Sequence, residues 1–216
     1  MSEAPVALSP IQPVAPTEVR DGWLVSRVRS HAALRIADLT PQTKVLVRAS
    51  PHGGVAARLG VPFGRTRRTE LGLLVIGSGP DEWLLLSRPQ TFADVTASLD
   101  TADDDLVSVL DMTHGRALIR LSGPAAPDVL AKVCAIDLSD AVTPDGAAFR
   151  SSVADVASEV IRDDVLTPDG TERSYLVHCE RSSGQYLFDT LLDAGREFGI
   201  EVDGFHVERA ITEEQR

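Results

Sequence analysis

The clearest pattern of hydrophobic and polar positions lies in residues 111–138, DMTHGRALIRLSGPAAPDVLAKVCAIDL. From Arg116 to Leu121, apolar residues alternate with mostly basic ones, which is the two-residue period of a β-strand with one buried face. Thr113-His114-Gly115 predicts a turn before this strand, and Ser122-Gly123-Pro124 predicts its end. A helix is predicted next, because one helical face would carry Val129, Leu130, Val133 and Cys134.

The residues before this stretch predict several strands and two short helical segments. The first is one helical turn at Val55–Leu59, which Gly60 can end. Ser87 and Gln90 have the spacing of a helix capping box, so a second helix is expected to follow. Its apolar stripe is Phe92, Val95 and Leu99, and the predicted strands are Leu34–Ile36, Lys44–Arg48, Leu71–Ile76 and Trp83–Leu86, the last two forming a hairpin around residues 77–81.

The residues after this stretch repeat the same order of elements. A strand is predicted at Val153–Ile161, followed by a polar loop at Asp163–Arg173 and a second strand that begins near Tyr175. Ser182 and Gln185 again have capping-box spacing. The helix that follows is predicted from Leu187, Leu191, Ala194 and Phe198, with its end at Gly199 and a final strand at Ile200–Phe205.

This repetition predicts an α+β fold made of two similar strand–strand–helix–strand units, with helices on one side of antiparallel sheets. We expect a single globular domain at residues 23–206, with halves at about 23–112 and 113–206. Residues 1–22 are rich in Pro, Ala and Val without a period, which predicts an extended arm that is disordered alone and could become ordered against a partner, so the arm up to Trp23 is also an interface candidate. Residues 207–216 are predicted to be a polar tail.

The composition excludes several classes of protein. The 216 residues carry a net charge of −11, which would repel the phosphates of nucleic acid and of anionic membranes. No apolar run approaches the roughly 20 residues that span a bilayer. The N-terminal MSEAPVALSP lacks the basic start and apolar core of a signal peptide, so a cytoplasmic protein is expected. The two cysteines, Cys134 and Cys179, are interpreted as buried, unreactive thiols.

No motif in the sequence predicts catalysis, a cofactor or a metal site. There is no glycine-rich phosphate loop, and Ser122 lacks the surroundings of a nucleophile. Asp103–Asp105 is interpreted as a solvated loop, because it lacks the spaced ligands of a calcium site. His114 is either a turn residue that bonds to the backbone or the remnant of a ligand pocket. The other histidines, which also lack the spacing of metal ligands, are His31, His52, His178 and His206.

The most basic part of the chain is Arg65-Thr66-Arg67-Arg68. One interpretation is a solvated loop. The other is a contact with an acidic neighbour or a substrate carboxylate, because the planar guanidinium group matches a carboxylate. Trp23, where the ordered part of the chain is expected to begin, is a further candidate for a contact with a partner.

Two motifs resemble a known family. Asp111, Thr113, His114 and Gly115, followed by Ser122-Gly123-Pro124, resemble the Asp-x-Ser-His-x-Gly turn and Ser-Gly-Pro sequence of aminomethyltransferases, the T-proteins of glycine cleavage. In length, in its hairpin at residues 79–84 and in the spacing to residues 174–177, the chain is more similar to the gamma subunits of heterotetrameric sarcosine oxidase. The resemblance covers roughly residues 25–205 and implies the N-terminal part of the aminomethyltransferase folate-binding fold.

This resemblance implies a subunit of a complex that oxidises sarcosine to glycine, hydrogen peroxide and either formaldehyde or 5,10-methylenetetrahydrofolate. In such complexes the alpha and beta subunits carry FAD, FMN, NAD and the tetrahydrofolate site, and the delta subunit carries Zn. The gamma subunit would bind no cofactor and contribute no catalytic residue, and its role would be assembly with the alpha, beta and delta subunits. In agreement, Phe149–Ile161 lacks the family's Gly-x-x-x-Asp-Asp sequence, and neither Asp155 nor Glu159 can be assigned to its aspartate.

Two other functions stay open at this point. The chain could be a free-standing folate-binding protein for one-carbon transfer, which would need a pocket with a carboxylate and a stacking aromatic ring. It could also be an interaction module without flavoenzyme partners, because a fold does not fix a function. Under the assembly hypothesis, we expect the partner interface to include Trp23, Arg65, Arg67 and Arg68.

Overall fold

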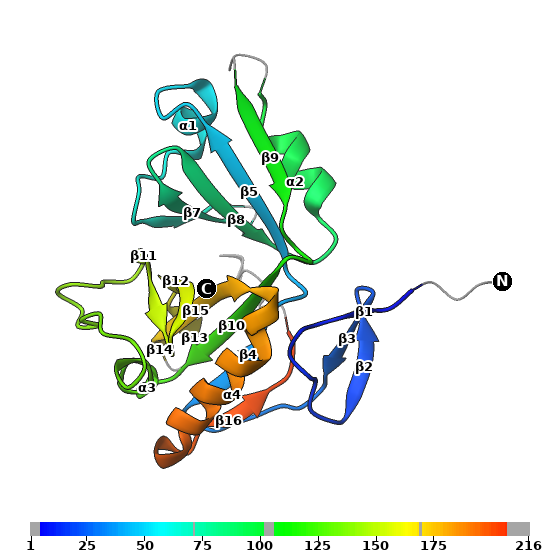
Figure 1. Ribbon diagram of the computed structural model, residues 1–216, viewed down its shortest axis with the longest axis vertical. Helices are drawn as coiled ribbons and strands as arrows, with labels where there is room; N and C mark the ends of the chain where they lie inside the picture. The colour runs from blue at the N-terminus through cyan, green and yellow to red at the C-terminus, as the bar shows by residue number, and fades with distance from the viewer. Residues whose placement is uncertain (1–4, 71, 102–105, 169, 207–216) are drawn as a thin grey trace.

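The computed structural model describes residues 5–70, 72–101, 106–168 and 170–206. Its two large sheets pack against each other, and each has helices on its outer face (Figure 1). This arrangement confirms the predicted α+β class with mainly antiparallel sheets. The predicted acidic loop at Asp103–Asp105 and the tail at residues 207–216 lie outside the described residues. The domain boundaries at residues 22 and 206 stay a prediction.

The first sheet lies in the upper part of Figure 1, and each pair of neighbouring strands in it is antiparallel. The helices α1 (Gly54–Leu59) and α2 (Phe92–Ser98) cover its outer face. Gly60 ends α1 with a left-handed φ of 59°, as predicted. The strand order is β6 (Thr66–Arg68), β7 (Leu74–Gly79), β8 (Glu82–Ser87), β5 (Thr43–Ala49) and β9 (Val107–Asp111).

The second sheet is antiparallel except for one parallel pair, β4 with β16. Its outer face is covered by α3 (Ala126–Ala131) and α4 (Gly184–Ala194). The short 3-10 helices η1 (Arg181–Ser183) and η2 (Arg196–Phe198) flank α4. The strand order is β11 (Ala148–Val153), β12 (Val156–Arg162), β15 (Ser174–Glu180), β10 (Arg116–Ser122), β4 (Arg35–Asp38) and β16 (Glu201–Asp203), with a separate hairpin of β13 (Val165–Thr167) and β14 (Gly170–Glu172).

The alternation in β10 confirms the strand that the sequence predicts. Ala117, Ile119 and Leu121 are fully buried in the core beneath α3 and α4. Leu118 belongs instead to the core between the two sheets. The helix after this strand is shorter than its apolar stripe indicates, because α3 ends at Ala131 and Cys134 lies beyond it.

The hairpin of β11 and β12 corrects one prediction. A single strand was expected at Val153–Ile161, but the chain reverses at Ala154 and Asp155, whose φ angles are 48° and 62°. Two consecutive left-handed residues make a tight hairpin turn, and that turn usually carries Asn-Gly or Asp-Gly. Ala154-Asp155 is a weak turn signal, so the sequence pattern predicts one strand that continues through these two residues.

Both predicted capping boxes are wrong. Thr91 and Ser183 precede the two helices, and neither cap has a side-chain hydrogen bond. The glutamines bond to distant segments of the chain instead. The Gln90 side chain donates to the carbonyl of Asp21, and Oε1 of Gln185 accepts a hydrogen bond from the backbone N–H of Gln12.

The described part of the N-terminal segment packs against its own chain, which differs from the disordered arm that was expected. It forms β1 (Ala7–Leu8) and β2 (Thr17–Arg20), which lie on either side of β3 (Trp23–Ser26). This small sheet stands beside the two large ones (Figure 1). Ile11 is only 1% exposed and contributes to the core under α4, which fixes the segment.

Candidate functional site

The layer between the two large sheets is apolar at its centre and polar at both ends. Along β10, Arg116, Leu118 and Arg120 point into this layer, because every second side chain of a strand faces the same way. Leu118 packs in the centre, whereas each arginine lines a separate cleft. The basic face that the sequence predicts for β10 therefore contributes to two candidate sites.

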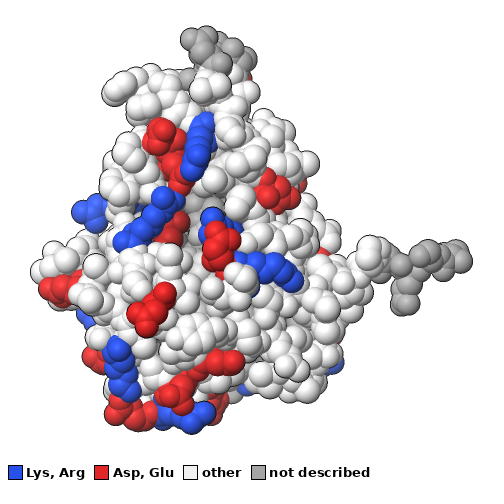
Figure 2. Space-filling view, in the orientation of Figure 1, with Lys and Arg blue, Asp and Glu red and all other residues white. Residues whose placement is uncertain are grey.

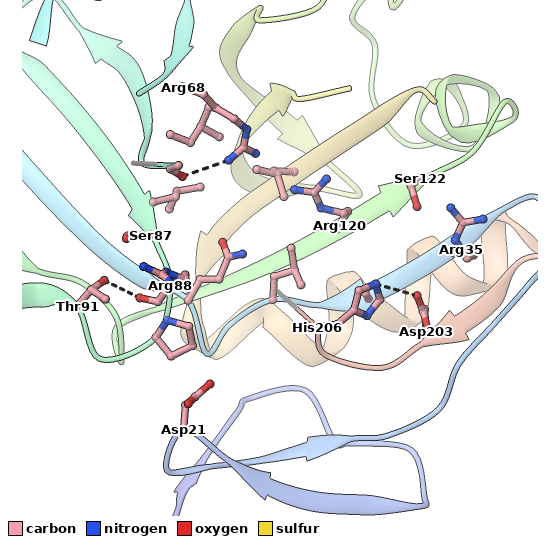
Figure 3. Close-up of a pocket in the computed structure, with 18 of the residues that line it drawn as sticks. Asp21, Arg35, Arg68, Ser87, Arg88, Thr91, Arg120, Ser122, Asp203 and His206 are labelled. Carbon is pink, nitrogen blue, oxygen red and sulfur yellow. Dashed lines mark hydrogen bonds and ion pairs between the residues drawn. The ribbon is translucent and has the colours of Figure 1, made fainter. Parts of the chain in front are cut away.

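The larger cleft has a volume of about 800 Å3 and is called the arginine cleft here. Figure 3 shows Arg68, Arg88 and Arg120 around it and Asp21 on the opposite rim. Arg68 lies on β6, Arg88 directly follows β8, and Arg120 lies on β10, so both large sheets contribute to the cleft. The other polar groups that line it belong to Arg35, Gln42, Glu70, Ser87, Thr91, Ser122, Asp203 and His206.

Carboxylates of the chain neutralise most of these guanidinium groups. Oδ2 of Asp163 accepts hydrogen bonds from Arg68 at 2.5 Å and from Arg120 at 2.9 Å. Asp163 and Arg120 are largely buried, with side-chain exposures of 8% and 11%. Arg35 pairs with Glu172 at 2.5 Å. An anion entering this cleft would therefore compete with carboxylates that are already in place.

Arg88 differs from the other arginines of the cleft. Its side chain is exposed and has no ion pair with any described residue, and Figure 3 places it on the cleft wall. Across the cleft, Nε2 of His206 lies 3.5 Å from Oδ2 of Asp203. These groups can bind polar ligands, but they do not form a nucleophile with a base beside it, as covalent catalysis requires.

The smaller cleft, of about 280 Å3, lies at the opposite end of β10 and is called the Glu82 cleft here. Glu82 is 7% exposed and pairs with both Arg48 and Arg150. Burial alone would raise the pKa of Glu82, but the hydrogen bonds from the two arginines outweigh burial and lower it. Acidic and basic side chains also lie next to one another on the face drawn in Figure 2.

A histidine–carboxylate pair lies in the same cleft. Nδ1 of His178 is 3.7 Å from the carboxylate of Glu159, and both side chains are at most 10% exposed. Burial lowers the pKa of His178, and the nearby Glu159 opposes this change. Nε2 of His178 is buried without a hydrogen-bond partner among the described residues. The pair could transfer a proton only to a group that displaces its present neighbours.

The structure separates the residues that the sequence offered as an interface. Trp23 is only 4% exposed and stacks on the ring of His114, with 4.7 Å between ring centres. His114 lines neither cleft, and its ring contacts Trp23, so both interpretations of His114 stay predictions. Within β6, Arg67 donates to the carbonyl of Leu59 at 2.6 Å and Arg68 reaches the arginine cleft. Arg65 is exposed, with no side-chain partner among the described residues.

The remaining candidate residues from the sequence are the two cysteines, Asp155 and Glu159. Cys134 and Cys179 are buried free thiols, and burial raises the pKa of Cys179 to about 11. Asp155 lies in the turn between β11 and β12, away from both clefts, whereas Glu159 lines the Glu82 cleft. Among the described residues, no group of three His, Cys, Asp or Glu side chains could hold a metal ion. No helix in the described ranges is long and apolar enough to cross a membrane.

The sequence did not identify the buried residue Lys44 as a candidate. Lys44 is 0% exposed and lies where the chain crosses between the sheets, at residues 39–42 and 112–115. Its Nζ donates to the carbonyls of Thr40 at 2.6 Å, Gln42 at 2.9 Å and Thr113 at 3.2 Å. The sequence placed Lys44 in a strand but gave no sign of these acceptors, because they come from two separate crossings.

Comparison with known proteins identifies similar chains. Residues 65–214 match the family model of the GCVT N-terminal domain. The chain is 30% identical over 177 residues to sarcosine oxidase subunit gamma of Corynebacterium sp. strain P-1, which covers 78% of this chain and 83% of that protein.

Two solved structures are similar as well. One is a heterotetrameric sarcosine oxidase from Corynebacterium sp. U-96, with a TM-score of 0.64 and 25% identity over 85% of this chain and 91% of the matched one. The other is aminomethyltransferase T from Bartonella henselae, with a TM-score of 0.63 and 17% identity over 88% of this chain and 56% of that one. At 17% identity, the second similarity concerns the fold alone.

Proposed function

The chain belongs to the GCVT N-terminal domain family and, within it, to the gamma subunits of sarcosine oxidase, and from this membership we propose that it is a non-catalytic subunit of a heterotetrameric sarcosine oxidase. The observation that carries the proposal is the extent of the match, which runs through most of this chain and most of the gamma subunit it resembles. Because the proposed subunit is not catalytic, its proposed role is in the assembly of the complex.

The chemistry of the two clefts supports a role without catalysis. Asp163 and Glu82 each hold two guanidinium groups, so most of the arginine charges that line the clefts, Arg88 excepted, are paired inside the chain. Networks of this kind fix the edges of two sheets against each other. Under this proposal, alpha and beta subunits bind FAD, FMN, NAD and tetrahydrofolate, and a delta subunit binds Zn. The complex would lie in the cytoplasm.

The proposed contact surface includes the exposed arginines of the β6 region, Arg65, Arg67 and Arg68. Trp23 has little surface left for a partner, because its ring stacks inside the chain. The arginines are suited to carboxylates of a neighbouring subunit, since a guanidinium group binds a carboxylate with two parallel hydrogen bonds. A cluster of basic side chains is unusual on a chain whose net charge is −11.

An affinity purification of the tagged chain from native extract tests the subunit role. We expect a yellow complex with two larger chains and one smaller chain, which mass spectrometry and visible absorbance would detect. A colourless lone chain would contradict the proposal. For the surface, the double variant Arg67→Glu, Arg68→Glu should reduce the yield of complex, whereas Arg196→Glu, at an exposed site on η2, should not.

A free-standing folate-binding enzyme receives less support. The arginine cleft is large enough for such a ligand, but the described residues that line it include no Phe, Tyr or Trp for stacking. Titration of the isolated chain with tetrahydrofolate by calorimetry measures this alternative directly. Binding in the micromolar range would favour it over the assembly role.

A further inference from the structure

The turn at residues 62–65, Pro-Phe-Gly-Arg, is held firmly against the first sheet and is called the Phe63 turn here. It closes with a hydrogen bond of 3.2 Å from the N–H of Arg65 to the carbonyl of Pro62. Gly64 adopts a φ of 79°, which suits the third position of a type II turn. Hydrogen bonds of 2.9 Å connect Gly64 and Arg65 to the backbone of Gly77.

The turn is fixed from two sides. On one side, a Cβ atom at Gly77 would lie 2.2 Å from the carbonyl oxygen of Pro62, so the turn rests directly on the bare backbone of β7. On the other side, the N–H of Ala148 donates to the carbonyl of Gly64 at 3.0 Å. Since both sheets hold it, the turn presents its side chains in a defined geometry.

Phe63 occupies the corner of this turn and is 62% exposed. Aromatic and arginine side chains are the commonest residues that dominate the energy of protein interfaces. An aromatic ring on a rigid turn loses little conformational freedom on binding, which increases the net gain from burying it. Phe63 therefore has the position and the rigidity of an interface anchor.

The charge around the turn favours a particular kind of partner. Residues 54–69 contain Arg58, Arg65, Arg67 and Arg68 but no Asp or Glu, although the whole chain carries a net charge of −11. Arg65 follows Phe63 by two residues and has no side-chain partner among the described residues. A complementary surface would therefore combine an apolar pocket with carboxylates at its rim.

We propose that Phe63 inserts into an apolar pocket of a neighbouring subunit, and that Asp or Glu residues at the rim of that pocket bind Arg65. The proposal rests on the subunit role described above and adds the residue that anchors the contact. Arg65 contributes specificity and faster association, because exposed charges guide an encounter more than they stabilise the complex.

Reconstitution of the complex from co-expressed subunits tests this contact. The affinity of the gamma chain for the other subunits would be measured by surface plasmon resonance. Phe63→Ser should bind at least about tenfold more weakly than wild type, as expected when an anchor residue is lost. Leu166→Ser is the matched control, because Leu166 is 63% exposed but lies on β13, outside the large sheets. Arg65→Glu should weaken binding mainly at low salt, and Arg65→Lys should restore part of it.

The outcomes separate the two proposals. If wild type binds and Phe63→Ser binds equally well, the anchor is overturned while the subunit role stands. If Leu166→Ser loses as much affinity as Phe63→Ser, the effect is not specific to the turn and the anchor is also overturned. If wild type does not bind, the subunit role itself fails, and the anchor fails with it. Thermal unfolding of each variant checks that the chain remains folded.

Discussion

The two large sheets have the same connectivity but differ beside their central strands. The first runs β5-α1-β6-β7-β8-α2-β9 and the second β10-α3-β11-β12-β15-α4-β16, with the β13–β14 hairpin inserted before β15. In the first, β9 pairs directly with β5. In the second, β4 takes the corresponding place beside β10, and β16 is displaced to pair with β4.

Because of this difference, the strand beside β5 is an edge strand, whereas the strand beside β10 has a neighbour on both sides. Leu110 of β9 is 48% exposed, whereas Ile36 of β4 is fully buried between two strands. Open edges and exposed apolar side chains are features that soluble proteins usually cover. The first sheet also carries the Phe63 turn. Both repeats have a buried core, but the first also leaves the apolar side chains of Leu110 and Phe63 exposed.

The largest effect is expected from Gly123→Ala, in the loop that follows β10. A Cβ atom there would lie 2.0 Å from the carbonyl oxygen of Ala33, and the φ of 129° is available almost solely to glycine. We expect a loss of at least about 4 kcal/mol in the free energy of unfolding. Gly72→Ala is the control, because φ is also positive there but no atom lies within 4 Å of the added carbon. It should cost about 1–2 kcal/mol. Similar urea midpoints for the two variants would contradict this account.

Ile36→Ala and Leu110→Ala compare the two strands that flank the central ones. Ile36 is fully buried, so its truncation should leave a cavity and cost about 2–5 kcal/mol. Leu110 is half-exposed, so its truncation should cost about 0.5 kcal/mol or less. Chemical denaturation of both variants gives the two values. Equal costs would show that β9 is packed as tightly as β4.

Asp163 and Glu82 compare the two clefts, since each carboxylate holds two arginines. Asp163→Asn removes a buried negative charge that bonds to Arg68 and to the largely buried Arg120, and we expect a cost of about 3 kcal/mol. Glu82→Gln affects Arg48 and Arg150, which are 62% and 58% exposed and can turn to water. Its cost should be about 1 kcal/mol or less. Urea denaturation at neutral pH measures both, and a reversed order would contradict the difference in burial.

The sequence predicts elements well where the signal is local. The alternation in β10 and the glycine that ends α1 depend on neighbouring residues, and the structure agrees with both. The helix predicted to end at Gly199 ends earlier, because α4 stops at Ala194 and Gly199 instead ends the short η2. The turn between β11 and β12 was missed because Ala154 and Asp155 adopt left-handed angles without a glycine. The capping boxes failed because spacing alone does not show whether a glutamine will bond to a distant segment.

The clefts could be predicted only in part. The sequence shows the basic face of β10. It does not show that Arg120 pairs with Asp163 and Arg116 with Glu180, because these partners are distant in sequence. Asp163 and Arg68 are 95 residues apart in sequence. Trp23 was expected to contact a partner, yet its ring stacks on His114, a contact that depends on how the N-terminal strands fold back.

At Lys44, where the two crossings between the sheets meet, the expected effect is a dependence of stability on pH. Burial lowers the pKa of Lys44 to about 7, while the charges of Asp38 and Asp111 oppose this change. In the unfolded chain, lysine has its ordinary pKa of about 10.4. Between about pH 7 and pH 10 the unfolded chain therefore binds a proton that the folded chain lacks. The free energy of unfolding should rise with pH there, by at most about 1.4 kcal/mol per pH unit.

Lys44→Met removes this group, so its stability should depend less on pH across the same window, in urea denaturation at several pH values. Lys132→Met is the control for exchanging a lysine for methionine, because the Lys132 side chain is 41% exposed, whereas Lys44 is buried. The charge of Lys44 also acts on the pKa values of Asp38 and His178, so the difference between the curves reports Lys44 together with these two neighbours. If wild type and Lys44→Met have the same slope, Lys44 keeps its proton in the folded chain. The three carbonyl acceptors around Nζ would then outweigh burial, and the junction would be held by a charged lysine.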